Sequence, residues 1–296
     1  MCRLNPKVDF AFKKLFGSEE NKDILIAFIN SIIDENEQIK DIELKNPYNI
    51  SDYRKGKMTI LDIKAVDDKY VWYDIEMQIS QQDFFDKRAL YYWSKVYSSQ
   101  IESGEDYEKL RKTISINILD FNYLKEKEFH NEFKIYNTKT LKEFSNMFEM
   151  HFIELNKFNK DYKDLKTGLD RWIAFLSRAY ELDKDNIPEE LAEDKEVKKA
   201  IEKLDIMYLS KEEREIYEDD LKALMDYRAQ IKTAERNGRI EGKKEGIKEG
   251  MEKGIEKGKI QEKVDIAKKL LDILDDETIS IKVGLSIDEI KKLRNK

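Results

Sequence analysis

Apolar and polar residues alternate through residues 60–79, and this pattern predicts a β-hairpin. Two runs rich in β-branched and aromatic residues flank a polar Asp67-Asp68-Lys69 turn. Asp62 lies in the first run, whereas Glu76 and Gln78 lie two residues apart in the second and therefore share a face. Hairpin pairing is expected to bring Asp62 close to Glu76 and Gln78.

The 3–4 residue spacing of apolar positions predicts helices on both sides of the hairpin. Residues 18–34 form an amphipathic helix that Ser18 is expected to cap, after a shorter first helix that ends at Gly17. Residues 83–103 form a further helix, and Gly104 is its expected C-cap.

Later apolar runs predict a sheet and then an almost entirely helical region. Strands are expected at residues 113–121, 132–137 and 147–155, and helices from residue 168 onward. The order of helices and strands in the first 155 residues indicates a mixed α/β layer fold.

Glycine recurs every fourth residue from Gly238 to Gly258, among Lys, Glu, Ile and Met. Each glycine costs a helix about 1 kcal/mol relative to alanine, so helix propensity does not account for the repeat. One interpretation is a flexible linker. The other is a helix whose glycine ridge allows a second helix to approach closely.

Residues 264–292 predict a small helical tail with a helix-turn-helix shape. Its last helix begins with Ser286 and has Glu289 three residues later, which is a capping box. Packing or oligomerisation is one role for this tail, and DNA reading is the alternative.

Composition narrows the class of protein. Charged residues make up 40% of the 296 residues, an excess that predicts long exposed helices. A net charge of −7 argues against a uniformly basic nucleic-acid binder but leaves room for a local basic groove. The single cysteine, Cys2, forms no internal disulfide, and His130 and His151 are too few and too scattered for a zinc site.

The chain starts without an apolar signal region, and no later stretch approaches the length of a membrane span. These features predict a soluble, cytoplasmic protein with no membrane partner.

The polar residues of the hairpin suit a hard metal ion. Mg²⁺ takes oxygen ligands, usually one or two carboxylates together with water and phosphate. Asp62 and Glu76 are the candidate ligands, and Gln78 is placed to orient water or a phosphate oxygen. The alternative is that Asp62 faces solvent or pairs with Lys64.

Several segments, in order, resemble the PD-(D/E)XK nucleases and, more closely, the recombination-promoting nuclease (Rpn) family of transposases in that superfamily. The resemblance covers nearly the whole chain. It is carried by the segments Asp9–Gly17, Leu61–Ala65 and Ile75–Gln78, by Arg88, Tyr91, Tyr92 and Tyr97, by the run from Gly104 to Leu110, and by the glycine repeat with its helical tail.

The resemblance implies a restriction-endonuclease-like core, a central mixed sheet flanked by helices, followed by an all-helical C-terminal region. It implies a DNA endonuclease that depends on Mg²⁺, with Mn²⁺ as a substitute. Asp62 and Glu76 are then the metal ligands, Gln78 is the third active-site residue, and Asp9 is a possible acid of the first helix. Gln78 departs from the lysine found in many superfamily members, which leaves water activation less defined.

Possible DNA contacts come from two helices. Lys13 and Lys14 on the first helix either contact phosphate or form a solvated face. On the helix after the hairpin, Arg88 is suited to phosphate, and Tyr91 and Tyr92 either stack on bases or pack against the protein.

The expected organisation is a nuclease-like core at 1–165, a helical extension at 166–236, the glycine repeat at 237–260 and the small tail at 261–296. DNA is the expected partner, with a possible homo-oligomer through the C-terminal helices. The competing hypothesis is a non-catalytic interaction or oligomerisation protein on a nuclease-derived fold.

Overall fold

The computed structural model describes residues 3–48, 63–81, 83–182, 186–205 and 209–295. The chain divides into two compact units, Met1–Tyr227 and Arg228–Lys296. The strands are β1 (Ile42–Leu44), β2 (Ile63–Asp67), β3 (Trp72–Gln78), β4 (Thr113–Leu119), β5 (His130–Tyr136) and β6 (Glu143–Glu154). The α-helices are α1 (Asp9–Phe16), α2 (Lys22–Asn30), α4 (Phe85–Ser98), α5 (Gly168–Arg178), α6 (Glu189–Ala192), α7 (Lys195–Lys203), α8 (Lys211–Leu270), α9 (Asp276–Val283) and α10 (Ile287–Arg294).

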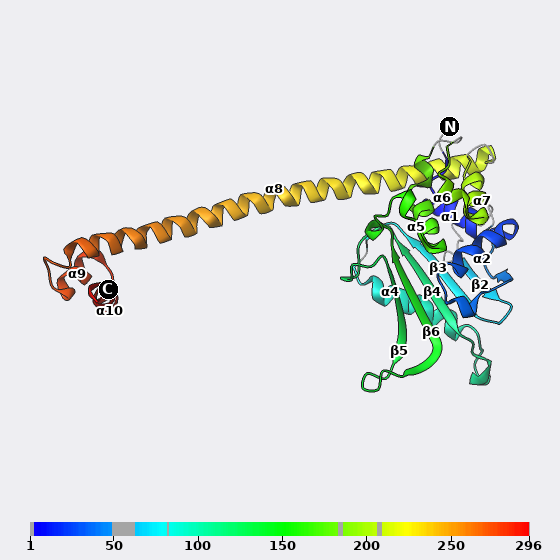
Figure 1. Cartoon of the computed structure of the whole chain (residues 1–296), viewed down its shortest axis with the longest axis horizontal. Helices are drawn as coiled ribbons and strands as arrows, with labels where there is room; N and C mark the ends of the chain where they lie inside the picture. The colour runs from blue at the N-terminus through cyan, green and yellow to red at the C-terminus, as the bar shows by residue number, and fades with distance from the viewer. Residues whose placement is uncertain (1–2, 49–62, 82, 183–185, 206–208, 296) are drawn as a thin grey trace. The chain divides into compact units, whose positions relative to one another are not determined.

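The strands form one mixed sheet in the order β1-β2-β3-β4-β6-β5. The pairs β3–β4 and β4–β6 are parallel, and the other neighbours are antiparallel. Parallel neighbours need a crossover connection, and the connection from β3 to β4 contains α4, as Figure 1 shows.

The predicted hairpin is confirmed over its described residues. Ile63 pairs with Ile75 and Val66 pairs with Trp72 in an antiparallel register. The carboxylate of Asp67 accepts hydrogen bonds from the backbone N–H groups of Lys69 and Val71, at 2.9 and 2.8 Å. Asp67 therefore organises a tight turn of the kind that aspartate favours.

The two faces of the sheet pack against different helices. One face carries Tyr73 and Ile75 into a large core, which also contains apolar residues of α1, α2, α5 and α7. The other face carries Phe148, Met150 and Phe152, which pack against Phe85 and Ala89 of α4. Because side chains alternate along a strand, every second residue of the central strands faces α4.

Two predicted helix ends are wrong. Ser18 makes no capping hydrogen bond to the following helix, and its hydroxyl donates instead to the carbonyl oxygen of Lys14 at 2.5 Å. A short 3₁₀ turn, Glu19–Asn21, then leads into α2. Helix α4 ends at Ser98, and Gly104 lies in the loop beyond it with a φ of 92°.

Helix α8 contains the whole glycine repeat, so the repeat is helical in this structure. Lys253 and Glu249 form an i,i+4 ion pair at 3.3 Å, which supports the helix by a few tenths of a kcal/mol. Apart from the neighbouring residues and the adjacent backbone of α8 itself, no described atom lies within 4 Å of the position that a Cβ would take at any glycine from Gly238 to Gly258.

The last turns of α8 and the tail that follows them share a small core, in which Ala267, Ile279 and Ile290 are fully buried. Gly284 ends α9 with a φ of 70°, and Ser286 and Glu289 form the predicted capping box of α10. None of the described helices is both long and apolar enough to cross a membrane.

Candidate active site

Strand β3 presents three polar side chains to the face of the sheet that α4 covers. Asp74, Glu76 and Gln78 alternate with the core residues Tyr73, Ile75 and Met77. Asp74 is fully buried and Glu76 is 3% exposed. Burying carboxylates is costly unless charges or donors lie beside them, so this face of β3 needs polar surroundings.

Glu76 and Gln78 line a cavity of about 470 Å³ at the carboxyl end of β3. Asp9 of α1 and Arg88 of α4 line the same cavity, although they are far from β3 in the sequence. The structure thus brings together four of the residues that the sequence analysis assigned to the site.

Arg88 supplies positive charge beside Glu76. Its guanidinium Nη2 lies 3.9 Å from Glu76 Oε2, and its planar group lies 5.1 Å from the ring centre of Tyr92. The Arg88 side chain remains 29% exposed. Arg88 is therefore both oriented by neighbours and open to an incoming anion.

Asp9 opens α1 at the edge of the cavity. Its carboxylate pairs with Lys13 Nζ at 2.9 Å, one turn further along the helix. The Asp9 side chain is 43% exposed, whereas that of Lys13 is 8% exposed. The ammonium group of Lys13 thus holds the Asp9 carboxylate against α1.

Asp62 lies outside the described residues, so its role stays a prediction. It directly precedes Ile63, which pairs with the residue before Glu76. The alternative partner, Lys64, donates to Ser99 Oγ at 3.0 Å and lies 4.8 Å from the ring centre of Trp72. Burial lowers the pKa of Lys64, and the nearby charge of Asp74 opposes this shift.

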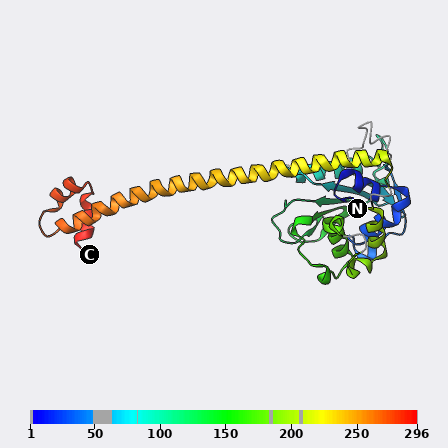
Figure 2. The same ribbon diagram turned by 90° about the horizontal axis from the view of Figure 1, so that it is seen from above.

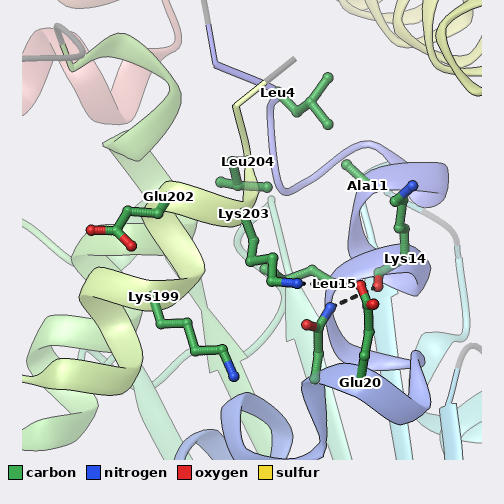
Figure 3. Close-up of a pocket in the computed structure, with 10 residues that line it drawn as sticks. Leu4, Ala11, Lys14, Leu15, Glu20, Lys199, Glu202, Lys203 and Leu204 are labelled. Carbon is green, nitrogen blue, oxygen red and sulfur yellow. Dashed lines mark hydrogen bonds and ion pairs between the residues drawn. The ribbon is translucent and has the colours of Figure 1, made fainter. Parts of the chain in front are cut away.

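Lys14, unlike Asp9 of the same helix, does not line the cavity that contains Glu76. It pairs with Glu213 of α8 and lines a separate cavity of about 510 Å³ between α1 and α7. Figure 3 shows Lys199 and Lys203 of α7 lining the same cavity, and Lys203 Nζ lies 3.3 Å from Glu20 Oε1. Carboxylates thus neutralise the lysines of this second cavity.

Tyr91 and Tyr92, the two predicted stacking residues, lie one turn beyond Arg88 on α4. Their ring centres are 5.7 Å apart, and Tyr91 is 52% exposed. Lys95 lies 5.1 Å from the ring centre of Tyr91, and a hydrogen bond with Tyr91 raises the pKa of Lys95. The ring of Tyr91 is thus accessible to solvent, whereas the guanidinium of Arg88 packs against the ring of Tyr92.

Sequence analysis missed three residues of this region. Asp74 was detectable, because it precedes Glu76 by two residues in an alternating strand. The other two, Asp220 and Tyr227 of α8, line the cavity. They lie more than 100 residues from β3, and no local pattern marks them.

A second group of polar residues lies on the opposite face of the sheet. One ligand atom from each of Glu132, Glu149 and His151 falls within 4.8 Å of the others. Because Phe152 pairs in register with Asn117, which pairs with Glu76, Phe152 shares the face of Glu76, and Glu149 and His151 point the other way.

Two lysines of the protein itself lie against the carboxylates of this second group. Glu149 contacts Lys112 Nζ at 2.9 Å and His151 Nε2 at 2.8 Å. Burial would raise the pKa of Glu149, but hydrogen bonds from His151 and Lys112 outweigh it and lower that pKa to about 2. Lys134 lies between Glu132 and Glu149, at 2.5 and 3.6 Å.

His130 and His151, which the sequence analysis took as too scattered for a zinc site, are in contact. His130 Nε2 lies 2.9 Å from His151 Nδ1, and the rings stack with centres 5.1 Å apart. Burial, together with the nearby His151, lowers the pKa of His130 to about 4. The antiparallel pairing of β5 and β6 creates this contact.

The donor atoms of the first cavity fit a hard divalent ion. Glu76 and Asp9 offer carboxylate oxygens and Gln78 offers an amide oxygen, whereas the described lining contains neither histidine nor cysteine. Mg²⁺ and Mn²⁺ prefer oxygen ligands, and zinc sites usually contain nitrogen or sulfur. Glu76 would hold such an ion, and Asp9 and Gln78 would offer further oxygen atoms from the wall of the same cavity.

A mixed sheet flanked by helices, with acidic residues at the end of a central strand, is the architecture of a PD-(D/E)XK nuclease. The sequence matches the family described as PD-(D/E)XK nuclease family transposase over residues 6–234. The chain belongs to this family, and the predicted fold class is confirmed. No curated protein and no solved structure matches the chain.

Family membership supports a nuclease- or transposase-like function with DNA as the substrate. Nucleases of this superfamily typically use divalent metals, which agrees with the oxygen-rich lining of the first cavity. The match ends at residue 234, close to the boundary between the two compact units.

Proposed function

We propose that this protein is a Mg²⁺-dependent DNA endonuclease of the recombination-promoting type, which hydrolyses backbone phosphodiesters and accepts Mn²⁺ as a substitute. The observation that carries the proposal is the convergence of Glu76, Gln78, Asp9 and Arg88 on one cavity, in a chain of a nuclease family. Cytoplasmic DNA is the expected target.

In this proposal, Asp62 and Glu76 hold the metal. When bound, a divalent ion supplies positive charge to the phosphate and makes water a better nucleophile. Arg88 binds a phosphate oxygen, because its partly exposed guanidinium lines the cavity and offers a fork of N–H donors. Gln78 orients a water molecule or a phosphate oxygen through its carboxamide, which cannot take up a proton as a neutral lysine amine does.

DNA beyond the cleaved bond is expected to meet α4. Tyr91 offers an exposed ring on which an unpaired base can stack. Lys13 is paired with Asp9 and Lys14 with Glu213, so either lysine must leave its carboxylate before it can contact a DNA phosphate.

Plasmid cleavage tests this function. Purified protein is incubated with supercoiled plasmid across a Mg²⁺ and Mn²⁺ series, and Asp62→Ala is compared with Asp68→Ala, an exposed aspartate of the hairpin turn. We expect nicking or linearisation by the wild type and by Asp68→Ala, and none by Asp62→Ala. Full activity of Asp62→Ala would contradict the proposal.

A second candidate function is assembly through α8, with or without catalysis. Ile247, Met251 and Ile255 are more than half exposed, at 54, 66 and 59%, and each directly follows a glycine of the repeat. An apolar stripe beside a glycine ridge suits the close packing of a second helix. We infer that a second copy of this helix is the partner.

Sedimentation velocity separates these possibilities. Replacing Ile247 and Ile255 by Asn is expected to convert an oligomer into a monomer, whereas Lys253→Asn on the same helix leaves it intact. An oligomer without Mn²⁺ binding or cleavage would favour the interaction protein. A monomeric wild type would contradict assembly through α8.

DNA reading by the tail has little support from its charges. Helix α10 starts with Asp288 and Glu289, and a recognition helix usually presents its first turns to the bases. Arg294 is bound to Asp276 at 2.8 Å and to backbone carbonyl oxygens. Loss of DNA affinity after removal of residues 264–296 would reverse this assessment.

A further inference from the structure

The first turns of α8 present one buried face to the nuclease core. Tyr217 and Leu224 are 5 and 6% exposed, and Ile216 and Leu221 pack against the same core. Their spacing is that of an amphipathic helix. Asp220 is partly buried on this face, at a position where the pattern calls for an apolar residue. A carboxylate there has a cost that some contact must offset.

Asp220 contacts the start of α1. Its Oδ2 accepts a hydrogen bond from the backbone N–H of Phe10 at 3.3 Å. Helix α1 has no cap of its own, because the residue at its N-cap position is Val8. A side-chain oxygen at a helix N-terminus satisfies a backbone N–H group that has no partner within the helix. Asp220 therefore supplies the missing cap from a distant helix.

Other residues of the same α8 face hold the surroundings of α1. The hydroxyl of Tyr217 accepts from the backbone N–H of Asn5 at 2.8 Å, and Glu213 pairs with Lys14. The hydroxyl of Tyr227 accepts from the backbone N–H of Gln81, just after β3, at 3.1 Å. Figure 2 shows the start of α8 running alongside the N-terminal helices.

The capped end of α1 is the end that carries Asp9. Asp9 directly precedes Phe10, and both Asp9 and Asp220 line the cavity that contains Glu76. On the other side, Lys7 pairs with Asp120 at the end of β4, at 3.1 Å. The segment that carries Asp9 is thus held between β4 and α8.

We propose that Asp220 is a positioning residue of the candidate active site: by capping α1, it holds Asp9 at the cavity where Glu76 binds the metal. This inference rests on the proposed function for the identity of the site. It makes the first turns of α8 part of the nuclease rather than a connection to the tail. Asp220 acts through its hydrogen bond to the backbone, so an oxygen acceptor is required and a negative charge is not.

Two substitutions and a neighbouring control test this role in the full chain. Asp220→Ala removes the acceptor, Asp220→Asn keeps an oxygen without the charge, and Asp219→Ala removes an exposed carboxylate next to it. Hydrogen exchange of peptides covering residues 4–16 reports the cap, and calorimetric titration with Mn²⁺ reports the site.

We expect Asp220→Ala to exchange about fivefold faster over residues 4–16, which corresponds to the loss of a helix cap. We also expect its Mn²⁺ affinity to fall about tenfold, as for loss of a residue that orients a ligand. Asp220→Asn and Asp219→Ala are expected to match the wild type in both measurements.

Three results are decisive. Unchanged exchange in Asp220→Ala would overturn the proposal. Loss of Mn²⁺ affinity in Asp220→Asn with unchanged exchange would also overturn it, because Asp220 would then act as a charged ligand. Absence of Mn²⁺ binding by the wild type would contradict the proposed function, and the exchange measurement would still decide whether Asp220 holds α1.

Discussion

Glu76 and Glu149 are both buried glutamates of the central sheet, but they face opposite sides of it. Glu149 is neutralised by Lys112 and Lys134 and is hydrogen-bonded with His151. Glu76 lies at a cavity, with the guanidinium of Arg88 3.9 Å away. A buried carboxylate therefore does not by itself identify an active site, whereas a buried carboxylate at a cavity lined by further oxygen atoms is a candidate.

The largest expected effect separates these glutamates by activity. Glu76→Gln keeps the shape of the side chain but removes the charge that holds a metal, so we expect plasmid cleavage to fall by about a hundredfold or more. Glu149→Gln is the matched control and should cleave like the wild type. Equal loss of cleavage in both variants would abolish the distinction between the two faces.

The next effect separates them by stability. Glu149→Ala leaves the largely buried Lys112 without one of its carboxylates, and we expect the free energy of unfolding to fall by about 3 kcal/mol. Urea denaturation measures this change. Glu43→Ala removes an exposed partner of Lys45 and should cost less than about 1 kcal/mol. A similarly small cost for Glu149→Ala would show that the network is dispensable.

Mild acid should lower the stability of the fold through His130. The pKa of His130 is about 4 in the folded protein and 6.5 in a free side chain. The unfolded chain therefore takes up the proton first, and stability falls as the pH drops from 6.5 to 4, on the order of 2 kcal/mol. The lowered pKa of Glu149 adds a further loss only below pH 4.5.

Urea denaturation at several pH values measures this dependence. His130→Gln cannot titrate and should flatten the curve between pH 6.5 and pH 4, while the loss below pH 4.5 remains. An unchanged slope in His130→Gln would assign the acid sensitivity to other groups.

The smallest expected effect concerns the cation beside Glu76. Arg88→Ala should weaken DNA binding by roughly tenfold and reduce the salt dependence of binding by about one phosphate contact. Lys87→Ala, the neighbouring lysine of α4, is the control. Fluorescence anisotropy without divalent metal measures binding apart from cleavage, and equal losses in both variants would point to nonspecific charge.

Local patterns predicted much of this protein. Alternation in residues 60–79 predicted the hairpin, and the same alternation placed Glu76 and Gln78 on one face. Ser286 and Glu289 predicted a capping box that the structure contains. These features depend on interactions within a few residues of the chain, which a sequence displays directly.

Other features had no local signal or had a misleading one. Ser18 has the residue type of a cap, but its hydroxyl bonds back to Lys14, because a 3₁₀ turn intervenes before α2. The glycine repeat left helix and linker open, since its glycines oppose helix formation while its Glu–Lys pairs favour it. The structure resolves that choice in favour of helix.

Motifs and periodicity alone were enough to predict the family, the order of helices and strands, and the candidate residues Asp62, Glu76 and Gln78. Folding was needed to bring Arg88 and Asp9 to the cavity of Glu76, to place Asp220 at the start of α1, and to put His130 against His151. These contacts join residues that are far apart along the chain. Periodicity records which face a side chain occupies, but the neighbour on that face is chosen by packing between elements that the sequence separates.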